Sequence, residues 1–465
     1  MHRPMSWPAG CRSVPGYGVI GRMTITPTRR LTADEVVALN RQYTFFSWSA
    51  QAKINPIAID HGEGIYFWDP DGKRYIDFNS QLMSVNIGHG DKRVADAIAQ
   101  QAHQLAFAAP QFATEVRGRL GELLATLTPG NLNKFFFTLG GAEANENALR
   151  LARITTGRQK VIAHHRSYHG ATAGSISVTG DPRRWANEPG VPGVIRVLDP
   201  WRWGQTEPEP VDRQLEYLEE VIQYEGPHTI AAFILETVTG TNGVLIPPDG
   251  YLQGIRDICD RHGILMITDE VMAGFGRTGR WFAVDHWDVV PDLLTMAKGL
   301  TSSYLPLGAV AMKPEIAEYF EDRVYYGGLT YSAHPVSCAA AIAAVGVLRD
   351  DDLIGNAARL GVVMHELLTD LEARHPSVGT TRNIGLFGVI ELVRNQQTKE
   401  PMTAFNASSP EMAALDARLR ADGLYTMQHW HQVFTNPPLC ITEEQLREGF
   451  AIIDQALEMT DAAVA

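Results

Sequence analysis

The sequence has few cysteines, and the four that it has, Cys11, Cys259, Cys338 and Cys440, lie far apart without a Cys-x-x-Cys pair. This pattern excludes a disulfide framework and a zinc ribbon, and it favours a reducing, cytoplasmic setting. The chain also lacks the run of about 18–20 apolar residues that is needed to cross a bilayer, so we expect no association with a membrane.

Positive charge is also scarce. The 465 residues include 40 Lys and Arg against 53 Asp and Glu, which gives a formal net charge of −13. Proteins whose main partner is nucleic acid usually present a basic face, so this balance argues against such a partner. Hydrophobic residues make up 45% of the chain, which is typical of a folded globular protein rather than a disordered one.

The N-terminal stretch has little that would fold or direct export. Residues 1–22 lack the apolar core of a signal peptide, and Met23 offers an alternative start, so this stretch is either a disordered tail or a start-site artefact. The length of the whole chain suits one large domain plus a smaller one. We predict a flexible extension (1–30), a segment that joins the small domain (31–77), a large domain (78–335) and a C-terminal small domain (336–465).

Short, nearly all-apolar runs alternate with longer amphipathic segments in the middle of the chain. Such continuous apolar strands between helices are typical of an α/β fold with a mainly parallel sheet covered on both faces. We also expect a hairpin between residues 60 and 77, a long helix over 335–348 and a strand over 383–391. The apolar runs are residues 134–138, 161–163, 230–235, 264–268 and 293–297.

Three of these runs end directly in a polar residue: Glu236, Asp269 and Lys298. Ligands of open α/β sheets bind beyond the carboxyl ends of the strands, so the three side chains are expected to share one site. A desolvated lysine has a lowered pKa and becomes a usable nucleophile. Such an amine can capture the aldehyde of pyridoxal phosphate, and a carboxylate can hold its ring nitrogen protonated. Lys298 and Asp269 suit these two roles.

The same cofactor needs a phosphate site and a partner for its flat ring. Gly141 and Ala142 lie between a predicted strand and a predicted helix, where backbone N–H groups bind phosphate. Tyr168 follows another predicted strand and could stack on the ring. Each feature alone more often marks a tight turn or a half-buried tyrosine. Their combination with Lys298 and Asp269 favours a cofactor site.

With these motifs the sequence resembles the class III, or omega, aminotransferases of the fold-type I pyridoxal-phosphate enzymes, over roughly residues 65–442. The resemblance implies a large domain with a mostly parallel seven-stranded sheet, plus a smaller α+β domain. It also implies a homodimer, or a dimer of dimers, with shared active sites. The matching motifs are residues 140–148, Tyr168-His169-Gly170, Asp269-Glu270-Val271, residues 274–279, Ala297-Lys298-Gly299, residues 330–335 and Pro437-Pro438-Leu439.

The resemblance assigns four of these residues to the cofactor's ring and aldehyde. Lys298 forms the Schiff base with the cofactor and later carries the proton between substrate and cofactor. Asp269 pairs with the ring nitrogen. Val271 and Tyr168 lie on the two faces of the ring. Lys298 is therefore the predicted catalytic residue.

Four further residues are implied as cofactor ligands or neighbours. Gly141 and Ala142 donate backbone N–H groups to the phosphate. Thr330 of the partner subunit gives the phosphate a hydroxyl group. Glu236 matches a family glutamate close to the cofactor face.

The main departure from the family lies at Met427. Many members carry an arginine about ten residues before the Pro-Pro-Leu motif, where it binds a substrate carboxylate. A methionine cannot pair with a carboxylate. Either His429, Arg166 or Lys53 takes over this task, or the preferred substrate lacks an α-carboxylate.

The segment 45–51 resembles the branch that acts on taurine and related ω-amines. We predict an aminotransferase that moves an amino group from an ω-amino acid or amine, such as taurine, β-alanine or a diamine, to pyruvate or 2-oxoglutarate. Its two half-reactions would follow a ping-pong order. By family analogy the substrate side is lined by Trp48, Leu82 and Met83, with Met427 and His429 nearby.

Several alternatives stay open at this stage. The same scaffold supports aminomutases, decarboxylases and racemases, because the shared motifs bind the cofactor rather than select the reaction. Residues 274–279 match the dinucleotide fingerprint G-x-G-x-x-G, but Asp269-Glu270 separate them from the strand, which argues against an NAD-dependent oxidoreductase. A relative that only binds partners would not need both Lys298 and Asp269. His429 and His431 could share a strand face, but without further ligands we predict no metal site.

Overall fold

The computed structural model describes residues 29–205 and 207–464, in two compact units. The smaller unit is Met1–Asp60 with Asp69–Gly72, and the larger is His61–Trp68 with Lys73–Ala465. The predictions for residues 1–22, and for most of the extension up to residue 30, lie outside the described residues. The four-part division of the chain stays a prediction.

In the smaller unit, helix α1 (Ala33–Tyr43) begins at a capping box. The Thr32 hydroxyl accepts the N–H of Glu35, and the Glu35 carboxylate accepts the N–H of Thr32 at 3.0 Å. This reciprocal pair satisfies two N–H groups that the first helical turn would leave without partners. The helix start is therefore determined locally.

The larger unit is built on a seven-stranded sheet, and the predicted α/β fold with a mostly parallel sheet is confirmed. Each predicted apolar run coincides with one of its strands to within one residue at either end. β10 runs antiparallel to both of its neighbours, while β9, β8, β7, β5 and β6 are mutually parallel. In spatial order the strands are β4 (Lys134–Thr138), β10 (Gly308–Met312), β9 (Leu293–Met296), β8 (Leu265–Asp269), β7 (Ile230–Glu236), β5 (Lys160–His164) and β6 (Val194–Val197).

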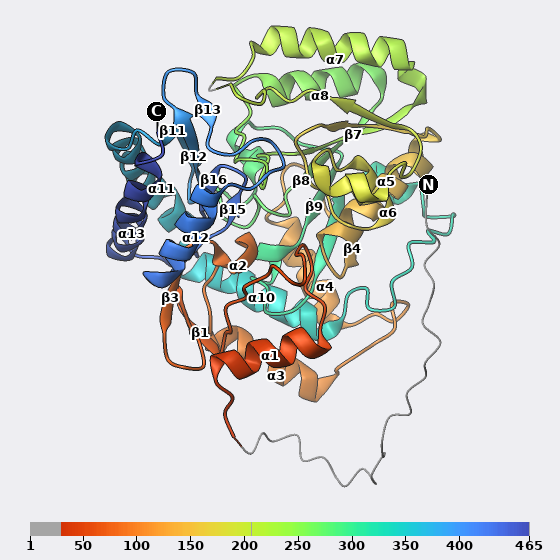
Figure 1. Cartoon of the computed structure of the whole chain (residues 1–465). Coiled ribbons are helices and arrows are strands. Elements are labelled where there is room, and N and C mark those ends of the chain that lie inside the picture. The colour runs from red at the N-terminus through yellow and green to blue at the C-terminus, as the bar shows by residue number, and fades with distance from the viewer. Residues whose placement is uncertain (1–28, 206, 465) are drawn as a thin grey trace, which may run out of the picture. The chain divides into compact units, whose positions relative to one another are not determined.

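Both faces of this sheet are buried, which explains why its strands are apolar without alternation. In β7, Phe233 and Leu235 belong to the hydrophobic cluster that includes helices α7 (Val211–Glu225) and α8 (Tyr251–His262). Ala232 and Ile234, which point the other way, belong to the cluster of helix α5 (Gly141–Thr156). Figure 1 shows α7 and α8 side by side on one side of the sheet, with α5 and the short α6 (Ala173–Val178) on the other.

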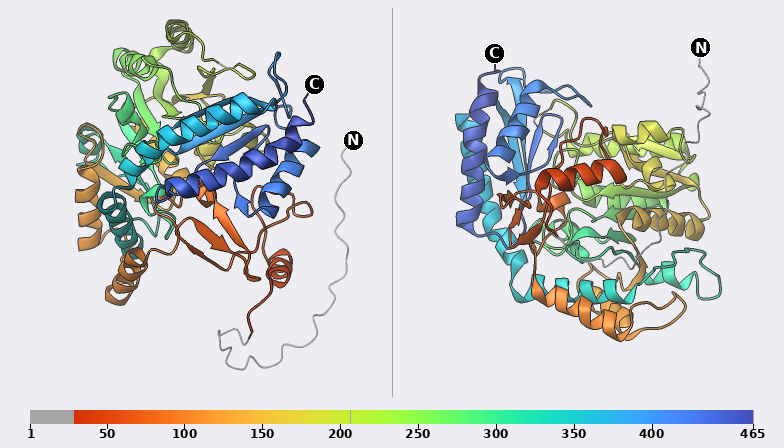
Figure 2. Two further views of the ribbon diagram at one scale, coloured as in Figure 1. Left: turned by 90° about the vertical axis from the view of Figure 1, so that its left-hand side faces the viewer. Right: turned by 60° about the horizontal axis from the view of Figure 1, so that its bottom comes forward.

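The C-terminal part of the larger unit combines long helices with a second sheet. Its long helices α11 and α13 lie side by side in Figure 2. The helices are α10 (Pro335–Asp350), α11 (Leu353–Arg374), α12 (Pro410–Ala421) and α13 (Glu443–Asp461), and the strands are β11 (Val378–Ile384), β12 (Phe387–Asn395), β13 (Glu400–Pro401), β15 (Gln428–His429) and β16 (Gln432–Thr435).

The remaining elements include a separate four-stranded sheet of order β1-β2-β3-β14. The predicted hairpin between residues 60 and 77 is present, because β2 and β3 pair antiparallel across the turn at residues 69–72, and β1 pairs antiparallel with β2 in the same sheet. These elements are β1 (His61–Glu63), β2 (Tyr66–Trp68), β3 (Arg74–Asp77), β14 (Leu424–Tyr425), α2 (Ser80–Met83), α3 (Lys92–Gln104), α4 (Glu115–Ala125) and α9 (Pro314–Glu318).

The prediction of one strand over residues 383–391 is wrong, because the segment turns back on itself. β11 ends at Ile384 and pairs with β12, which begins at Phe387. Gly385 has a φ of +56°, and a Cβ atom there would lie 2.4 Å from the backbone of Thr278. Only glycine suits both the turn and the close approach.

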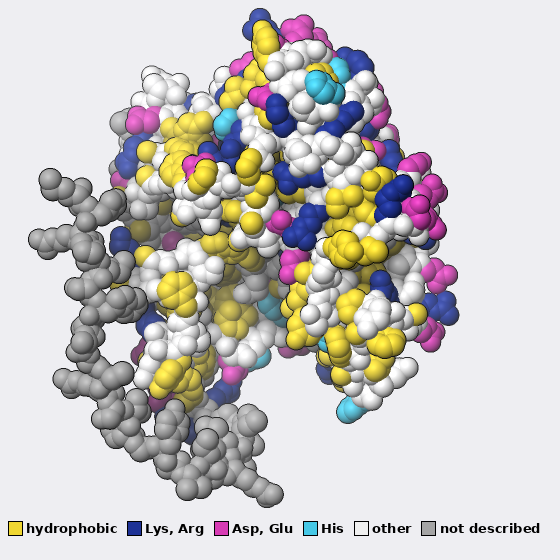
Figure 3. All heavy atoms as spheres, turned by 90° about the vertical axis from the view of Figure 1, so that its right-hand side faces the viewer, with side chains coloured by type: hydrophobic (Ala, Val, Ile, Leu, Met, Phe, Trp, Pro, Cys, Tyr) yellow, Lys and Arg dark blue, Asp and Glu magenta, His cyan; other side chains and the backbone are white. Residues whose placement is uncertain are grey.

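Charged side chains of both signs lie on the surface of the molecule (Figure 3). On the face drawn in Figure 3, Lys and Arg side chains are interspersed with Asp and Glu. In the part of the chain that the structure describes, no helix is long and apolar enough to span a bilayer. Among the same residues, no group of three His, Cys, Asp or Glu side chains gathers as a metal site would require.

Candidate active site

A cavity of about 350 Å³ opens where the parallel strands of the large sheet end. Glu236 ends β7, Asp269 ends β8, and Lys298 follows β9, so one cavity collects all three strand-end side chains. Their meeting follows from the parallel order of the strands. The other predicted residues that line it are Gly141, Ala142, Tyr168 and Val271.

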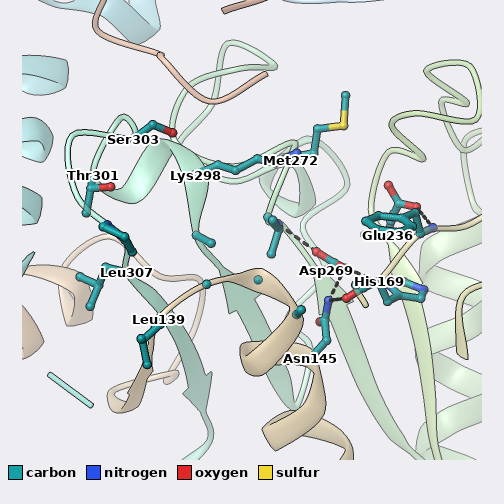
Figure 4. A pocket seen from close by; sticks show the side chains of 18 of the residues that line it. Leu139, Asn145, His169, Glu236, Asp269, Met272, Lys298, Thr301, Ser303 and Leu307 are labelled. Atoms are coloured by element: carbon teal, nitrogen blue, oxygen red, sulfur yellow. Dashed lines mark hydrogen bonds and ion pairs between the residues drawn. The ribbon is translucent and has the colours of Figure 1, made fainter. Parts of the chain in front are cut away.

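Asp269 is buried at the cavity, with 4% of its surface exposed. Its Oδ2 accepts hydrogen bonds from Asn145 Nδ2 at 2.7 Å and from His169 Nδ1 at 2.8 Å, as Figure 4 shows. Asn145 Oδ1 in turn accepts from the Thr295 hydroxyl at 2.7 Å. A carboxylate accepts but cannot donate, so His169 must carry its proton on Nδ1.

The second oxygen of Asp269 has room for one more donor. Oδ1 accepts the N–H of Val271 at 3.0 Å. Each carboxylate oxygen offers about two lone pairs, so Oδ2 is saturated while Oδ1 has one left. Asp269 is thereby prepared for one further N–H group, such as a protonated ring nitrogen.

Lys298 is the first residue of a short 3-10 turn (Lys298–Leu300) and is half-buried at the edge of the cavity. Burial lowers the pKa of its amine to about 8, and the carboxylates of Asp269 and Glu236 oppose part of that shift. About a tenth of the amine is therefore unprotonated at pH 7, far more than for a solvated lysine. The amine is prepared to attack an electrophile such as an aldehyde.

This pKa predicts how the cofactor-free protein takes up an aldehyde. The rate of covalent capture of pyridoxal phosphate by Lys298 should rise about tenfold per pH unit below pH 8 and level off above it, because only the unprotonated amine reacts. Stopped-flow absorbance from pH 6 to 10 measures this rate. Nα-acetyl-lysine under the same conditions controls for titration of the aldehyde itself. A midpoint near 10.5, the ordinary lysine value, would contradict the prediction.

The N-terminus of α5 provides a site for a phosphate. The helix begins at Gly141, and its N-cap Gly140 offers no side-chain cap to the first N–H groups. A 16-residue helix also presents a partial positive charge at this end. A Cβ atom on Gly141 would lie 2.7 Å from Cγ1 of Val271, so glycine keeps the helix end close to the cavity.

Tyr168 is held at the cavity by contacts to its backbone and to its ring. Its N–H donates to Glu236 Oε1 at 2.8 Å, while Glu236 Oε2 accepts the N–H of Gly240 at 2.8 Å. Burial raises the pKa of Glu236 to about 7. The Arg183 guanidinium lies 3.7 Å from the centre of the Tyr168 ring. The backbone of Tyr168 is thus held at the cavity, and its ring contacts Arg183.

Of the predicted site residues in the larger unit, five do not line this cavity. Thr330 is exposed, so its predicted contact with phosphate would require a second copy of the chain. Leu82 is 37% exposed, whereas Met83 is 1% exposed and packs in a hydrophobic cluster. Two further predicted residues, Trp48 and Lys53, belong to the smaller unit. Trp48 is 63% exposed and Lys53 is also exposed, and the roles of both stay predictions.

Met427 and His429 are the other two predicted site residues of the larger unit that do not line the cavity. Met427 packs against the hydrophobic cluster around Phe434. His429 Nδ1 lies 2.6 Å from the carbonyl of Thr241, and burial lowers the pKa of its imidazole. A neutral ring whose Nδ1–H is already used is a poor ligand for a carboxylate. Arg166, also considered for that role, donates Nη2 to the carbonyl of Asn242 at 2.6 Å.

The cavity also contains polar residues to which the sequence assigned no role. Asn145 lies one helical turn after Gly141, and a buried asparagine inside a helix is a signal, because asparagine is a poor helix former. His169 directly follows Tyr168. The others that line the cavity are Thr241, Thr301 and Ser303.

The dinucleotide interpretation of residues 274–279 is not supported. These residues form turns, and the next helical segment is the short 3-10 helix Ala283–His286. A dinucleotide fingerprint requires a helix that opens directly from the glycines and receives the pyrophosphate.

The residues of the cavity fit pyridoxal phosphate at three points. The amine of Lys298 suits its aldehyde, the free lone pair of Asp269 suits its ring nitrogen, and the start of α5 suits its phosphate. Tyr168 and Val271, which both line the cavity, provide surfaces for the ring between these points.

Comparison with known proteins agrees with this geometry. The model of the family described as "Aminotransferase class-III" matches residues 48–457. The putrescine–pyruvate aminotransferase of Pseudomonas aeruginosa is 34% identical over 423 residues, which cover 87% of this chain and 91% of that protein. The taurine–pyruvate aminotransferase of Bilophila wadsworthia is 32% identical over 446 residues, which cover 91% of this chain and 96% of that protein.

Solved structures give the same result. The taurine:2-oxoglutarate aminotransferase of Bifidobacterium kashiwanohense, in complex with PLP and glutamate, superimposes with a TM-score of 0.91 and 40% identity, covering 94% of this chain and 100% of that one. An (S)-enantioselective omega-transaminase of Thermomicrobium roseum superimposes with a TM-score of 0.87 and 37% identity, covering 92% of this chain and 99% of that one.

Proposed function

Since this chain belongs to the class III aminotransferase family, we propose that it moves an amino group from an ω-amino acid or amine to pyruvate or 2-oxoglutarate. Its relatives include enzymes named for putrescine, taurine and γ-aminobutyrate. Its cofactor is pyridoxal phosphate. The observation that carries the proposal is the meeting of Lys298, Asp269 and the start of α5 in one cavity.

When bound, pyridoxal phosphate withdraws electrons from the carbon that bears the amino group. In our proposal Asp269 holds the ring nitrogen in its protonated form, because hydrogen bonds from Asn145 and His169 keep its carboxylate in position. Lys298 would bind the cofactor, and its amine, once displaced by the amine of the substrate, would carry the proton from the substrate carbon to the cofactor. Burial lowers the pKa of this amine to about 8, which suits it to act as a base. Tyr168 and Val271 hold the ring in place between these groups.

The phosphate and the neighbouring subunit complete the proposed site. Gly141 and Ala142 would donate backbone N–H groups to the phosphate. Thr330, exposed on its own chain, would reach the phosphate of a second copy, so we propose a homodimer or a dimer of dimers. The free thiols of Cys259, Cys338 and Cys440 support a reducing, cytoplasmic setting.

The test is a screen of amine donors with pyruvate and with 2-oxoglutarate. At least one of taurine, β-alanine, 4-aminobutanoate and putrescine should yield its oxo product and the aminated acceptor in equal amounts, because transamination conserves the amino group. Chromatography with mass detection measures both products. Loss of carbon dioxide, or a rearranged amine without an aminated acceptor, would instead indicate a decarboxylase or an aminomutase.

A further inference from the structure

Apart from putrescine, the proposed donors and acceptors carry a carboxylate or sulfonate group, and a cation near the cavity would pair with that group. In the larger unit, Met427 is apolar in character and the candidate His429 is held neutral by burial. Arg277, whose charge also influences Lys298, is fully buried and donates to the carbonyls of Leu386 and Pro437. The remaining cation whose charge lowers the pKa of Lys298 is Arg183.

Arg183 touches two residues that line the cavity. Its guanidinium carbon lies 3.7 Å from the centre of the Tyr168 ring, and its Nη2 donates to the Thr241 hydroxyl at 2.7 Å. Tyr168 and Thr241 both line the cavity. Arg183 itself does not line the cavity and reaches it through these two residues, and its side chain is 27% exposed.

One edge of the Arg183 guanidinium is fixed, and the other is open. Nε donates to Asp181 Oδ2 at 2.8 Å, and Nη2 contacts the same carboxylate, which is almost fully buried. These bonds use Nε and Nη2, whereas Nη1 has no protein partner among the described residues. Asp181 therefore orients the guanidinium and leaves two N–H donors available.

Thr241 can add a further donor beside Arg183. Its oxygen accepts from Arg183, so its own O–H is directed elsewhere and can donate. Its carbonyl accepts from the His429 ring, which holds this loop in position. A charged guanidinium edge beside a hydroxyl is a suitable receptor for a carboxylate or sulfonate oxygen.

We propose that Arg183, assisted by the Thr241 hydroxyl, binds the acid group of the substrate and so determines the preference of this enzyme for acidic over non-acidic amines. This inference rests on the proposed aminotransferase function and names a residue for its specificity. Many members of the family bind a substrate carboxylate with an arginine at the position that Met427 occupies in this chain. Arg183 would take over that role here.

The experiment compares Arg183→Met with Arg184→Met. Arg184 is the adjacent residue and is also half-buried, but it donates to the carbonyl of Gly180 at 2.7 Å and pairs with Glu188. Single-turnover kinetics follow the bound cofactor's absorbance with taurine or 4-aminobutanoate, and with putrescine, which has no acid group. Arg183→Met should weaken the apparent affinity for the acidic donors by at least about tenfold, as expected for a lost charge-assisted hydrogen bond. The apparent affinity for putrescine should change by less than about twofold. Arg184→Met should change neither.

A second measurement does not depend on turnover of any donor. The probe is ethanesulfonate, which has the acid group of taurine but no amine, and its binding is measured by thermal shift or calorimetry. It should bind the wild-type protein about tenfold more tightly than it binds the Arg183→Met variant, and a few-fold more tightly than it binds the Thr241→Val variant. Equal losses for acidic and non-acidic donors, or unchanged ethanesulfonate binding, would overturn the inference and leave Arg183 as a support for Tyr168. A wild-type protein that aminates no acceptor would instead refute the proposed function.

Discussion

Replacement of Lys298 by alanine is expected to lower turnover by at least about 10⁴-fold, the upper range for loss of a single proton-transfer group. The variant loses both the amine that captures the aldehyde and the base that moves the proton. Its cofactor should still bind without a covalent bond, because Asp269 and the start of α5 remain. Borohydride treatment followed by mass spectrometry should find the cofactor attached to the wild-type protein and absent from the variant.

The matched control for this prediction is Lys160→Ala. Lys160 begins β5 at the opposite end of the sheet from the cavity, and it pairs with Glu225 at 2.8 Å on a partly exposed surface. Surface pairs of this kind contribute about 0–1 kcal/mol, so the control should fold and turn over normally. Wild-type activity in Lys298→Ala would rule out the proposed mechanism.

The second large effect is expected from Asp269→Asn, which should lower turnover by about 10²-fold or more, similar to loss of a preorganised electrostatic group. Two donors, Asn145 Nδ2 and His169 Nδ1, require the amide oxygen at the Oδ2 position. The amide nitrogen then occupies the Oδ1 position, where it can only donate. The ring nitrogen can accept that bond only in its unprotonated form, and its electron-withdrawing power falls.

Two measurements test this account of Asp269. Nitrogen NMR of cofactor labelled at the ring nitrogen should show a protonated ring in the wild-type protein and an unprotonated ring in Asp269→Asn. The control is Asp292→Asn, because Asp292 is similarly buried but pairs with Arg256 and Lys313 away from the cavity. Its loss should lower the free energy of unfolding by about 3 kcal/mol and leave turnover of the folded enzyme unchanged. A protonated ring in Asp269→Asn would refute the assigned role.

Most of the large sheet was predictable because its strands are buried on both faces. That environment demands continuous apolar runs, and a polar residue directly after such a run is conspicuous, as at Glu236, Asp269 and Lys298. The hairpin at Gly385 was missed, since the same apolar and glycine-rich pattern suits one long strand or two short ones. The distinguishing contact, to the backbone of Thr278, is distant in the sequence.

Polar partners of the site were harder to predict than its central residues. Asn145 and His169 lie 124 and 100 residues from Asp269 in the chain, and nothing in their local sequence specifies that they share one of its oxygens. That convergence depends on the order in which the strands pair and on how α5 packs against them.

The sequence by itself therefore determined the class of fold, the strand ends that carry Asp269 and Lys298, and the family, because apolar runs and short motifs are local properties of a chain. Only the tertiary structure decided how those groups are tuned: which oxygen of Asp269 is left free, how far burial lowers the pKa of Lys298, and that Arg183 lies against Tyr168 with one edge open. These properties depend on distances and burial between residues far apart in the chain, and such distances exist only once the chain has folded.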